Sequence, residues 1–240
     1  MHKKSKKHIL HSSQSIKAFL VFLSCLFLVN CSNSKQTKEV SSNKAPLERL
    51  LEGNKRFQKN HSKHPNQSML KRKELLKGQK PYAVIVTCSD SRVPPALIFD
   101  TGFGDLFVIR TAGNVIGDLE IGSIEYAVDH LGTKLVMVLG HQSCGAVKAS
   151  LDHHYDHQKE HGYIQEIVKY IDSEEEEQKL YKNGQKLIPL EQAVEANVRH
   201  GIHLLNSSQP VIDNLVKEKG LEIVGAVYQL ETGKVELLED

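Results

Sequence analysis

The sequence has 240 residues, and it lacks tryptophan, is poor in aromatic residues and carries no large excess of either charge. A formal net charge of +2 gives no reason to expect a nucleic acid partner. The apolar run at residues 18–29 has twelve residues, which as a helix span about 18 Å, less than the roughly 30 Å of a bilayer core. We therefore do not expect this run to cross a membrane as a stable helix.

The N-terminal segment has the pattern of an export signal. Residues 1–17 are lysine-rich and precede the short apolar run, as in a secretory signal peptide; a short buried helix is the alternative. The run ends in Leu28-Val29-Asn30-Cys31, which resembles a bacterial lipoprotein box with leucine three residues before the cysteine. Asn30 departs from the small residue normally found there, and Leu23-Ser24-Cys25 is a poorer rival.

These features divide the chain into three parts. Residues 1–31 are predicted to be a signal peptide, and lipidation of Cys31 would make it the new N-terminus. Residues 32–44 are rich in serine, asparagine and lysine and are predicted to be a flexible tether. We expect the protein to be exported to the periplasm or cell envelope and anchored to a bacterial membrane by lipid, with a folded domain at residues 45–240.

Strands and helices are predicted to alternate within that domain. Strands are expected at residues 82–88, 106–110, 134–141 and 221–230, and helices at 46–60, 68–77, 121–130, 144–154, 163–171, 190–205 and 210–219. Three of the four strands are almost continuously apolar, as in parallel strands covered on both faces. The pattern predicts an α/β fold with a central, mostly parallel sheet flanked by helices. The acidic run Glu174–Glu177 is expected to be a solvated helix face or loop.

Two polar clusters follow two of the predicted strands. Cys88-Ser89-Asp90-Ser91-Arg92 comes directly after the first strand, and His141-Gln142-Ser143-Cys144 comes directly after the third. Carboxyl ends of parallel strands meet at one edge of a sheet, so both clusters are expected there.

Two thiolates and one imidazole are a usual zinc ligand set with the fourth position open, as in catalytic sites. Asp90 could take that fourth position, or Arg92 could hold it away through a bidentate pair. A disulfide between Cys88 and Cys144 is open in an oxidising compartment. Buried inert thiols and a purely structural Asp90–Arg92 pair are the remaining alternatives.

Longer stretches around these clusters resemble a known family. TCSDSRVPPALIFDTGFGDLFVIRTAGN, IGSIEYAVDHLGTKLVMVLGHQSCGAVKA and LEIVGAVYQLETGKVEL are similar to the β-class carbonic anhydrases, over roughly residues 46–240. The resemblance implies one zinc ion per chain on Cys88, His141 and Cys144, and Asp90 and Arg92 as the catalytic dyad. It implies Gln79, Phe107 and Tyr126 as substrate-binding residues, and a homodimer or multiple of dimers with the helix at 46–60 as an arm.

The function implied is the reversible hydration of carbon dioxide to bicarbonate and a proton. Zinc would lower the pKa of its bound water, and the resulting hydroxide, oriented by Asp90 and Arg92, would attack carbon dioxide. One alternative is the hydrolysis of carbon disulfide or carbonyl sulfide at the same site. Another is a non-catalytic zinc- or bicarbonate-binding protein, against which the presence of Asp90, Arg92 and Gln79 argues.

Overall fold

A computed structural model describes residues 45–182, 187–207 and 211–239. The predicted signal peptide, the lipidation site Cys31 and the tether lie outside the described residues. Within those ranges, no helix is long and apolar enough to span a membrane.

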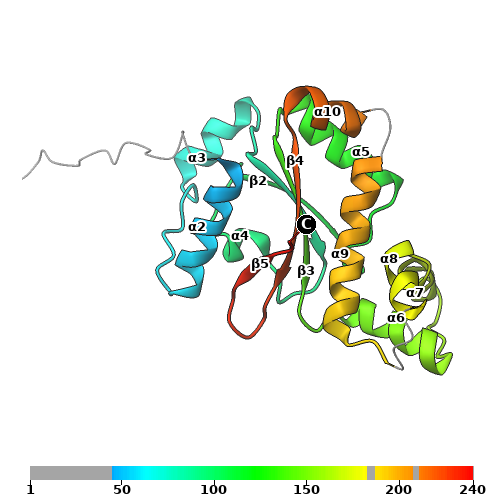
Figure 1. Cartoon of the computed structure of the whole chain (residues 1–240). Helices are drawn as coiled ribbons and strands as arrows, with labels where there is room; N and C mark the ends of the chain where they lie inside the picture. The colour runs from blue at the N-terminus through cyan, green and yellow to red at the C-terminus, as the bar shows by residue number, and fades with distance from the viewer. Residues whose placement is uncertain (1–44, 183–186, 208–210, 240) are drawn as a thin grey trace, which may run out of the picture. The chain divides into compact units, whose positions relative to one another are not determined.

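A five-stranded sheet runs through the middle of the domain (Figure 1). Its strands are β1 (Ala83–Cys88), β2 (Leu106–Thr111), β3 (Leu135–His141), β4 (Glu222–Tyr228) and β5 (Val235–Leu237), in the order β2-β1-β3-β4-β5. The first four are mutually parallel, and β5 pairs antiparallel with β4. The predicted α/β fold with a mostly parallel sheet is therefore confirmed.

The C-terminal end of the sheet differs from the prediction. The last predicted strand ends at Tyr228 rather than Leu230, because the chain turns there and Gln229 N–H donates to Lys234 O at 2.8 Å. Gly233, with φ of 72°, allows this turn. β5 follows, and its three residues are too few to produce a recognisable sequence period.

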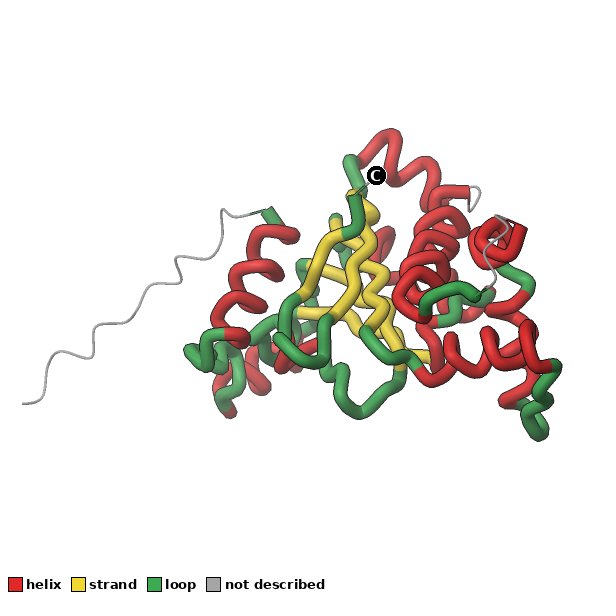
Figure 2. The backbone as a smooth tube through the Cα atoms, turned by 60° about the horizontal axis from the view of Figure 1, so that its bottom comes forward, coloured by secondary structure: helices red, strands yellow, loops and turns green. Residues whose placement is uncertain are grey.

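Helices cover both faces of the sheet (Figures 1 and 2). On one side lie α2 (Pro46–Gln58), α3 (Met69–Glu74) with the 3₁₀ turn η1 (Leu75–Lys77), and α4 (Pro95–Ile98). On the other lie α5 (Asp118–Glu125) with its π-helical extension η3 (Tyr126–His130), α6 (Gly145–Asp156), α7 (Ile164–Asp172), α8 (Glu175–Lys182), α9 (Leu190–Ser207) and α10 (Val211–Lys219). The short 3₁₀ turn η2 (Ala112–Asn114) follows β2.

Alternation along β1 assigns its side chains to two hydrophobic cores. Val84, Val86 and Cys88 belong to the core beneath α5–α10, whereas Ala83 and Ile85 belong to the core beneath α2 and α4. All six β1 residues are buried, which explains why the strand is apolar without interruption. The same alternation places the Cys88 thiol on the α6–α9 side of the sheet.

The prediction that the acidic run at 174–177 is a solvated surface is wrong. Glu174 and Glu177 are buried, at 3% and 0% exposure. The run begins one residue before α8, and α8 packs against α9. Two of the four glutamates in the run therefore face inward. Neither carboxyl oxygen of Glu177 accepts a hydrogen bond of normal geometry from the described residues. Burial, aided by the nearby Asp172, raises the pKa of Glu177 to about 8.

This burial predicts a pH-dependent stability. Because the pKa of Glu177 is higher in the folded than in the unfolded protein, the contribution of this residue to the free energy of unfolding is greatest below about pH 4 and declines until about pH 8. Glu177→Gln cannot ionise, so its free energy of unfolding should decline between pH 6 and pH 8 by about 2 kcal/mol less than that of the wild type. Denaturant unfolding at pH 6 and pH 8 measures this. The exposed Glu175→Gln in the same helix is the control, and an unaltered pH dependence in Glu177→Gln would contradict the prediction.

Candidate metal centre

Parallel pairing of β1 with β3 brings the two predicted clusters together. Thr87 lies opposite Leu139 in the ladder, so Cys88 and His141 end neighbouring strands at one edge of the sheet. Cys144 follows as the N-cap residue of α6, after a turn in which Ser143 has a φ of 57°. The ligand atoms of these three residues all lie within 4.8 Å of one another, and the residues are 6%, 0% and 1% exposed.

The donor set fits a metal ion. The imidazole of His141 is oriented by a 2.9 Å hydrogen bond between Nδ1 and Gln142 O, whereas its buried Nε2 has no hydrogen-bond partner among the described residues. Cys88 and Cys144 are free thiols, so the structure contains no disulfide between them. A buried, unpartnered imidazole nitrogen beside two thiols is the arrangement of a Cys₂His site, in which the second imidazole nitrogen is held by a carbonyl.

The electrostatics of the two thiols also favour a cation. The pKa of Cys88 is lowered to about 4, mainly because the Cys144 thiol donates to its sulfur, with His141 and the Gly113 N–H also contributing. The same contact, together with burial, raises the pKa of Cys144. The pair by itself therefore holds one negative charge, since a second thiolate would lie against the first. A divalent cation bound by both sulfurs removes that penalty.

Asp90 and Arg92 form a tight pair at the border of this cluster. Arg92 Nε donates to Asp90 Oδ1 at 2.9 Å and Arg92 Nη2 donates to Oδ2 at 2.7 Å, with a third bond from the Arg92 backbone N–H. These bonds hold the pKa of the Asp90 carboxyl well below its usual range. Asp90 Oδ2 lies 3.9 Å from His141 Nε2, so the oriented carboxylate is next to the ligand atoms.

Arg110 is a site residue that the sequence analysis missed. Its side chain donates from Nε to Cys88 O at 3.1 Å and from Nη2 to Asp90 O at 2.7 Å, which fixes the loop carrying both residues. The signal was a basic residue at the end of an otherwise apolar predicted strand. Arg110 lies opposite Thr87 in the ladder, one residue before Cys88.

The structure does not bring Gln79, Phe107 and Tyr126 to the metal centre of the same chain. Gln79 precedes β1 by four residues and is exposed, while Cys88 ends that strand, which is about 16 Å long. Phe107 lies opposite Val84, towards the start of β1. Tyr126 begins η3, and its ring centroid lies 6.4 Å from that of Phe107. The two aromatic residues thus meet each other, on the β2 side of the sheet.

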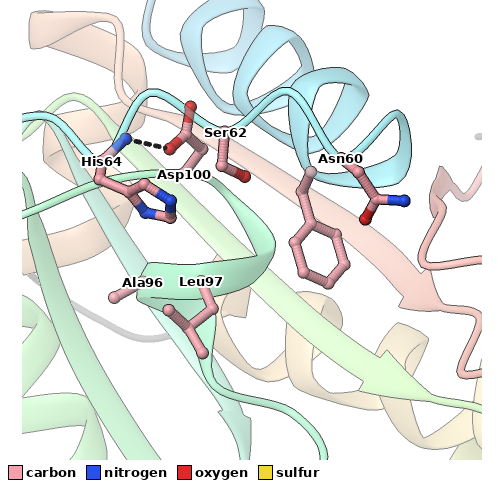
Figure 3. Close-up of a pocket in the computed structure, with 7 residues that line it drawn as sticks. Asn60, Ser62, His64, Ala96, Leu97 and Asp100 are labelled. Carbon is pink, nitrogen blue, oxygen red and sulfur yellow. Dashed lines mark hydrogen bonds between the residues drawn. The ribbon is translucent and has the colours of Figure 1, made fainter.

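A separate hollow lies on the α2–α4 side of the molecule (Figure 3). It has a volume of about 300 Å³ and is lined by Phe57, Asn60, Ser62, His64, Ala96, Leu97 and Asp100. Asp100 is buried and fully engaged: Arg56 Nε donates to it at 2.6 Å, and the backbone N–H groups of Lys63 and His64 donate at 3.0 and 2.9 Å. Its carboxylate therefore holds the loop after α2 in place.

Comparisons with known proteins agree with this geometry. Residues 83–235 match the family model described as "Carbonic anhydrase". "Carbonic anhydrase 2" of Mycobacterium tuberculosis is 40% identical over 188 residues, covering 78% of this chain and 89% of the relative. A Pseudomonas aeruginosa carbonic anhydrase is 30% identical, with 79% and 86% covered.

Solved structures give the same result. The Coccomyxa β-carbonic anhydrase in complex with acetazolamide has a TM-score of 0.62 and 29% identity, covering 81% of this chain and 87% of that one. A tetrameric β-carbonic anhydrase from Sordaria macrospora has a TM-score of 0.61 and 27% identity, with 70% and 86% covered. Because the family model spans more than half of the chain and the sequence relatives cover most of it, the chain belongs to the carbonic anhydrase family, with the fold of its β class.

Proposed function

We propose that this protein catalyses the reversible hydration of carbon dioxide to bicarbonate and a proton, with one zinc ion held by Cys88, His141 and Cys144. The observation that carries the proposal is the convergence of these three buried donors with an Asp90–Arg92 pair at their border. The named relatives, which are carbonic anhydrases, support it. Zinc at such a site would act as a Lewis acid and lower the pKa of a water molecule from 15.7 towards about 7.

The chain's own residues would orient the reaction. An ionised carboxylate only accepts hydrogen bonds, so Asp90 would accept one from the attacking water and direct its remaining lone pair at carbon dioxide. Arg92 keeps Asp90 ionised and fixes its plane with two side-chain hydrogen bonds. We therefore favour the arrangement in which Arg92 holds Asp90 away from the fourth metal position.

We further propose that the active unit is a homodimer or a multiple of dimers, in which each chain completes the site of the other. Gln79, Phe107 and Tyr126 lie away from the metal ligands of their own chain, and β2 is an edge strand. Val108 on this edge is 40% exposed, and Tyr126, whose ring lies near that of Phe107 in the same strand, is 47% exposed, an apolar surface suited to a second copy. The Sordaria macrospora relatives are described as tetrameric.

Finally, we propose that the protein is exported and anchored to a membrane of the cell envelope through a lipid on Cys31. The lysine-rich preface, the twelve-residue apolar run and the Leu28–Cys31 sequence support this proposal. A membrane anchor would place carbonic anhydrase activity outside the cytoplasm.

Two substitutions in the site separate metal binding from catalysis. Purified protein lacking residues 1–31 should contain about one zinc per chain, and Cys88→Ser should lose both zinc and activity because a ligand is missing. Asp90→Asn should retain zinc but lose activity by about 100-fold or more, since the amide can donate as well as accept. Metal analysis and stopped-flow hydration assays measure both.

The same assays distinguish the alternatives. Carbon disulfide and carbonyl sulfide are tested beside carbon dioxide, and faster turnover of either would replace the proposed substrate. Zinc binding without turnover of any of the three substrates would favour a non-catalytic binding protein. Full activity in Cys88→Ser without zinc would eliminate the mechanism.

Mixed dimers test the shared site. Asp90→Asn and Gln79→Ala should each lose most activity, but co-expressed chains should recover about a quarter of it, because half of the dimers are mixed and each has one intact site. Asp90→Asn co-expressed with Arg92→Ala is the matched control and should recover nothing, since both residues act within one chain. If the first mixture also recovers nothing, Gln79 does not act across the interface.

The anchor is tested by exchanging cysteines. Cys31→Ala should prevent lipidation and the corresponding cleavage. The cleaved, lipid-bearing form of the protein should therefore be absent from the membrane fraction. Cys25→Ala, within the same apolar run, is the control and should be processed normally. Mass spectrometry of the mature N-terminus gives the answer. A mature protein without lipid, cleaved elsewhere, would refute the anchor and leave export standing.

A further inference from the structure

The turn that follows β2 reaches the metal centre through its backbone. Thr111, the last residue of β2, lies opposite Cys88, so η2 begins where β1 ends. Two consecutive residues of η2 are left-handed, Gly113 with a φ of 68° and Asn114 with a φ of 48°. This conformation directs the Gly113 N–H at Cys88 Sγ, at 3.3 Å. A side chain at position 113 would collide with its neighbours, since a Cβ there would lie 2.9 Å from Ile171 Cδ1 and 3.0 Å from Ala146 Cβ.

A buried asparagine holds the other side of the same residue. Asn197, in α9, is 2% exposed, and its Nδ2 donates to Gly113 O at 2.8 Å across a sequence separation of 84 residues. The same Nδ2 lies 3.5 Å from Asn114 Oδ1. Gly113 is thus held on both sides, its carbonyl by Asn197 and its N–H by the sulfur of Cys88. A buried carbonyl that loses its donor costs about 1–3 kcal/mol, so the Asn197 contact strongly favours this turn conformation.

We propose that Asn197 is a positioning residue of the metal centre, which keeps the Gly113 N–H directed at the Cys88 sulfur through its bond to the Gly113 carbonyl. An N–H directed at a thiolate stabilises the charge that a metal ligand must carry. Partners of this kind, one layer outside the ligands, typically change metal affinity by about 10- to 100-fold when they are removed. The inference rests on the proposed function only in requiring that the protein bind zinc.

The chain offers a matched control for a purely structural role. Asn54, in α2, is also 2% exposed, and its Nδ2 donates to the carbonyls of Gly233 at 2.8 Å and Ile98 at 3.2 Å. Asn54 belongs to the opposite side of the sheet, where Ile98 is part of the core beneath α2 and α4. Asn54 Oδ1 also accepts from the backbone N–H of Val235 at 2.9 Å, so Asn54→Ala should weaken the fold at least as much as Asn197→Ala without disturbing the Cys88 sulfur.

The test compares zinc affinity in folded proteins. Wild type, Asn197→Ala and Asn54→Ala are titrated with a competing chelator, and Asn197→Ala should bind zinc about 10- to 100-fold more weakly than either of the others. In cobalt-substituted protein, the thiolate-to-cobalt absorption band should shift in Asn197→Ala alone. Equal zinc affinity and equal cobalt spectra in the two alanine variants would overturn the inference. A wild type that binds no zinc would instead refute the proposed function.

A measurement on the wild type keeps the inference testable if Asn197→Ala does not fold. In protein loaded with an NMR-active cadmium isotope, the amide proton of Gly113 should show scalar coupling to the metal through the Cys88 sulfur. Absence of that coupling, with cadmium bound, would show that the N–H is not directed at the ligand and would overturn the proposal.

Discussion

The parallel pairing of β1 with β3 is the constraint on which the metal centre depends. Ladder hydrogen bonds place Thr87 opposite Leu139, so the last residues of the two strands, Cys88 and His141, meet although they are far apart in the sequence. A shift of one residue in this register would turn every side chain of a strand to the other face and separate the two ligands. Both strands are buried on both faces, so such a shift would exchange side chains between two close-packed cores, and the cost of that repacking is what fixes the register.

The site uses backbone groups and the guanidinium groups of arginines for different tasks. The Gly113 N–H contacts the Cys88 sulfur, and Cys144 lies at the N-terminus of α6, where the helix dipole favours a thiolate. Arg92 instead binds the carboxylate of Asp90, and Arg110 binds two carbonyls of the same loop. Backbone dipoles therefore support the sulfur atoms, while Arg92 keeps Asp90 ionised and Arg110 fixes the loop that carries it.

Much of this arrangement could be predicted from the sequence, because strand ends have a known location in a parallel sheet. The two polar clusters were expected at one edge of the sheet on that basis. The structure brings Cys88, His141 and Cys144 together there, and Asp90 and Arg92 form an ion pair beside them. Local patterns carry no information on contacts made across the fold. The bond from Asn197 to Gly113 links α9 to η2, and nothing in the spacing of the two residues indicates it. Composition likewise suggested a solvated acidic run, whereas packing of α8 against α9 buries Glu174 and Glu177.

Buried polar residues have different roles on the two faces of the sheet. On the α2–α4 side, the buried side chains of Asn54 and Asp100 make hydrogen bonds to backbone groups of loops, the carbonyl of Gly233 and the N–H of Lys63. Neither of these bonds involves a metal ligand. On the other side, Cys88 and Cys144 belong to the same hydrophobic core as the strand residues beneath α9. Ligands that are part of a core can move little, because close-packed interiors resist displacement. The rigidity of the metal centre therefore comes from the packing that also stabilises the domain, and contacts such as Asn197 with Gly113 need only direct individual hydrogen bonds.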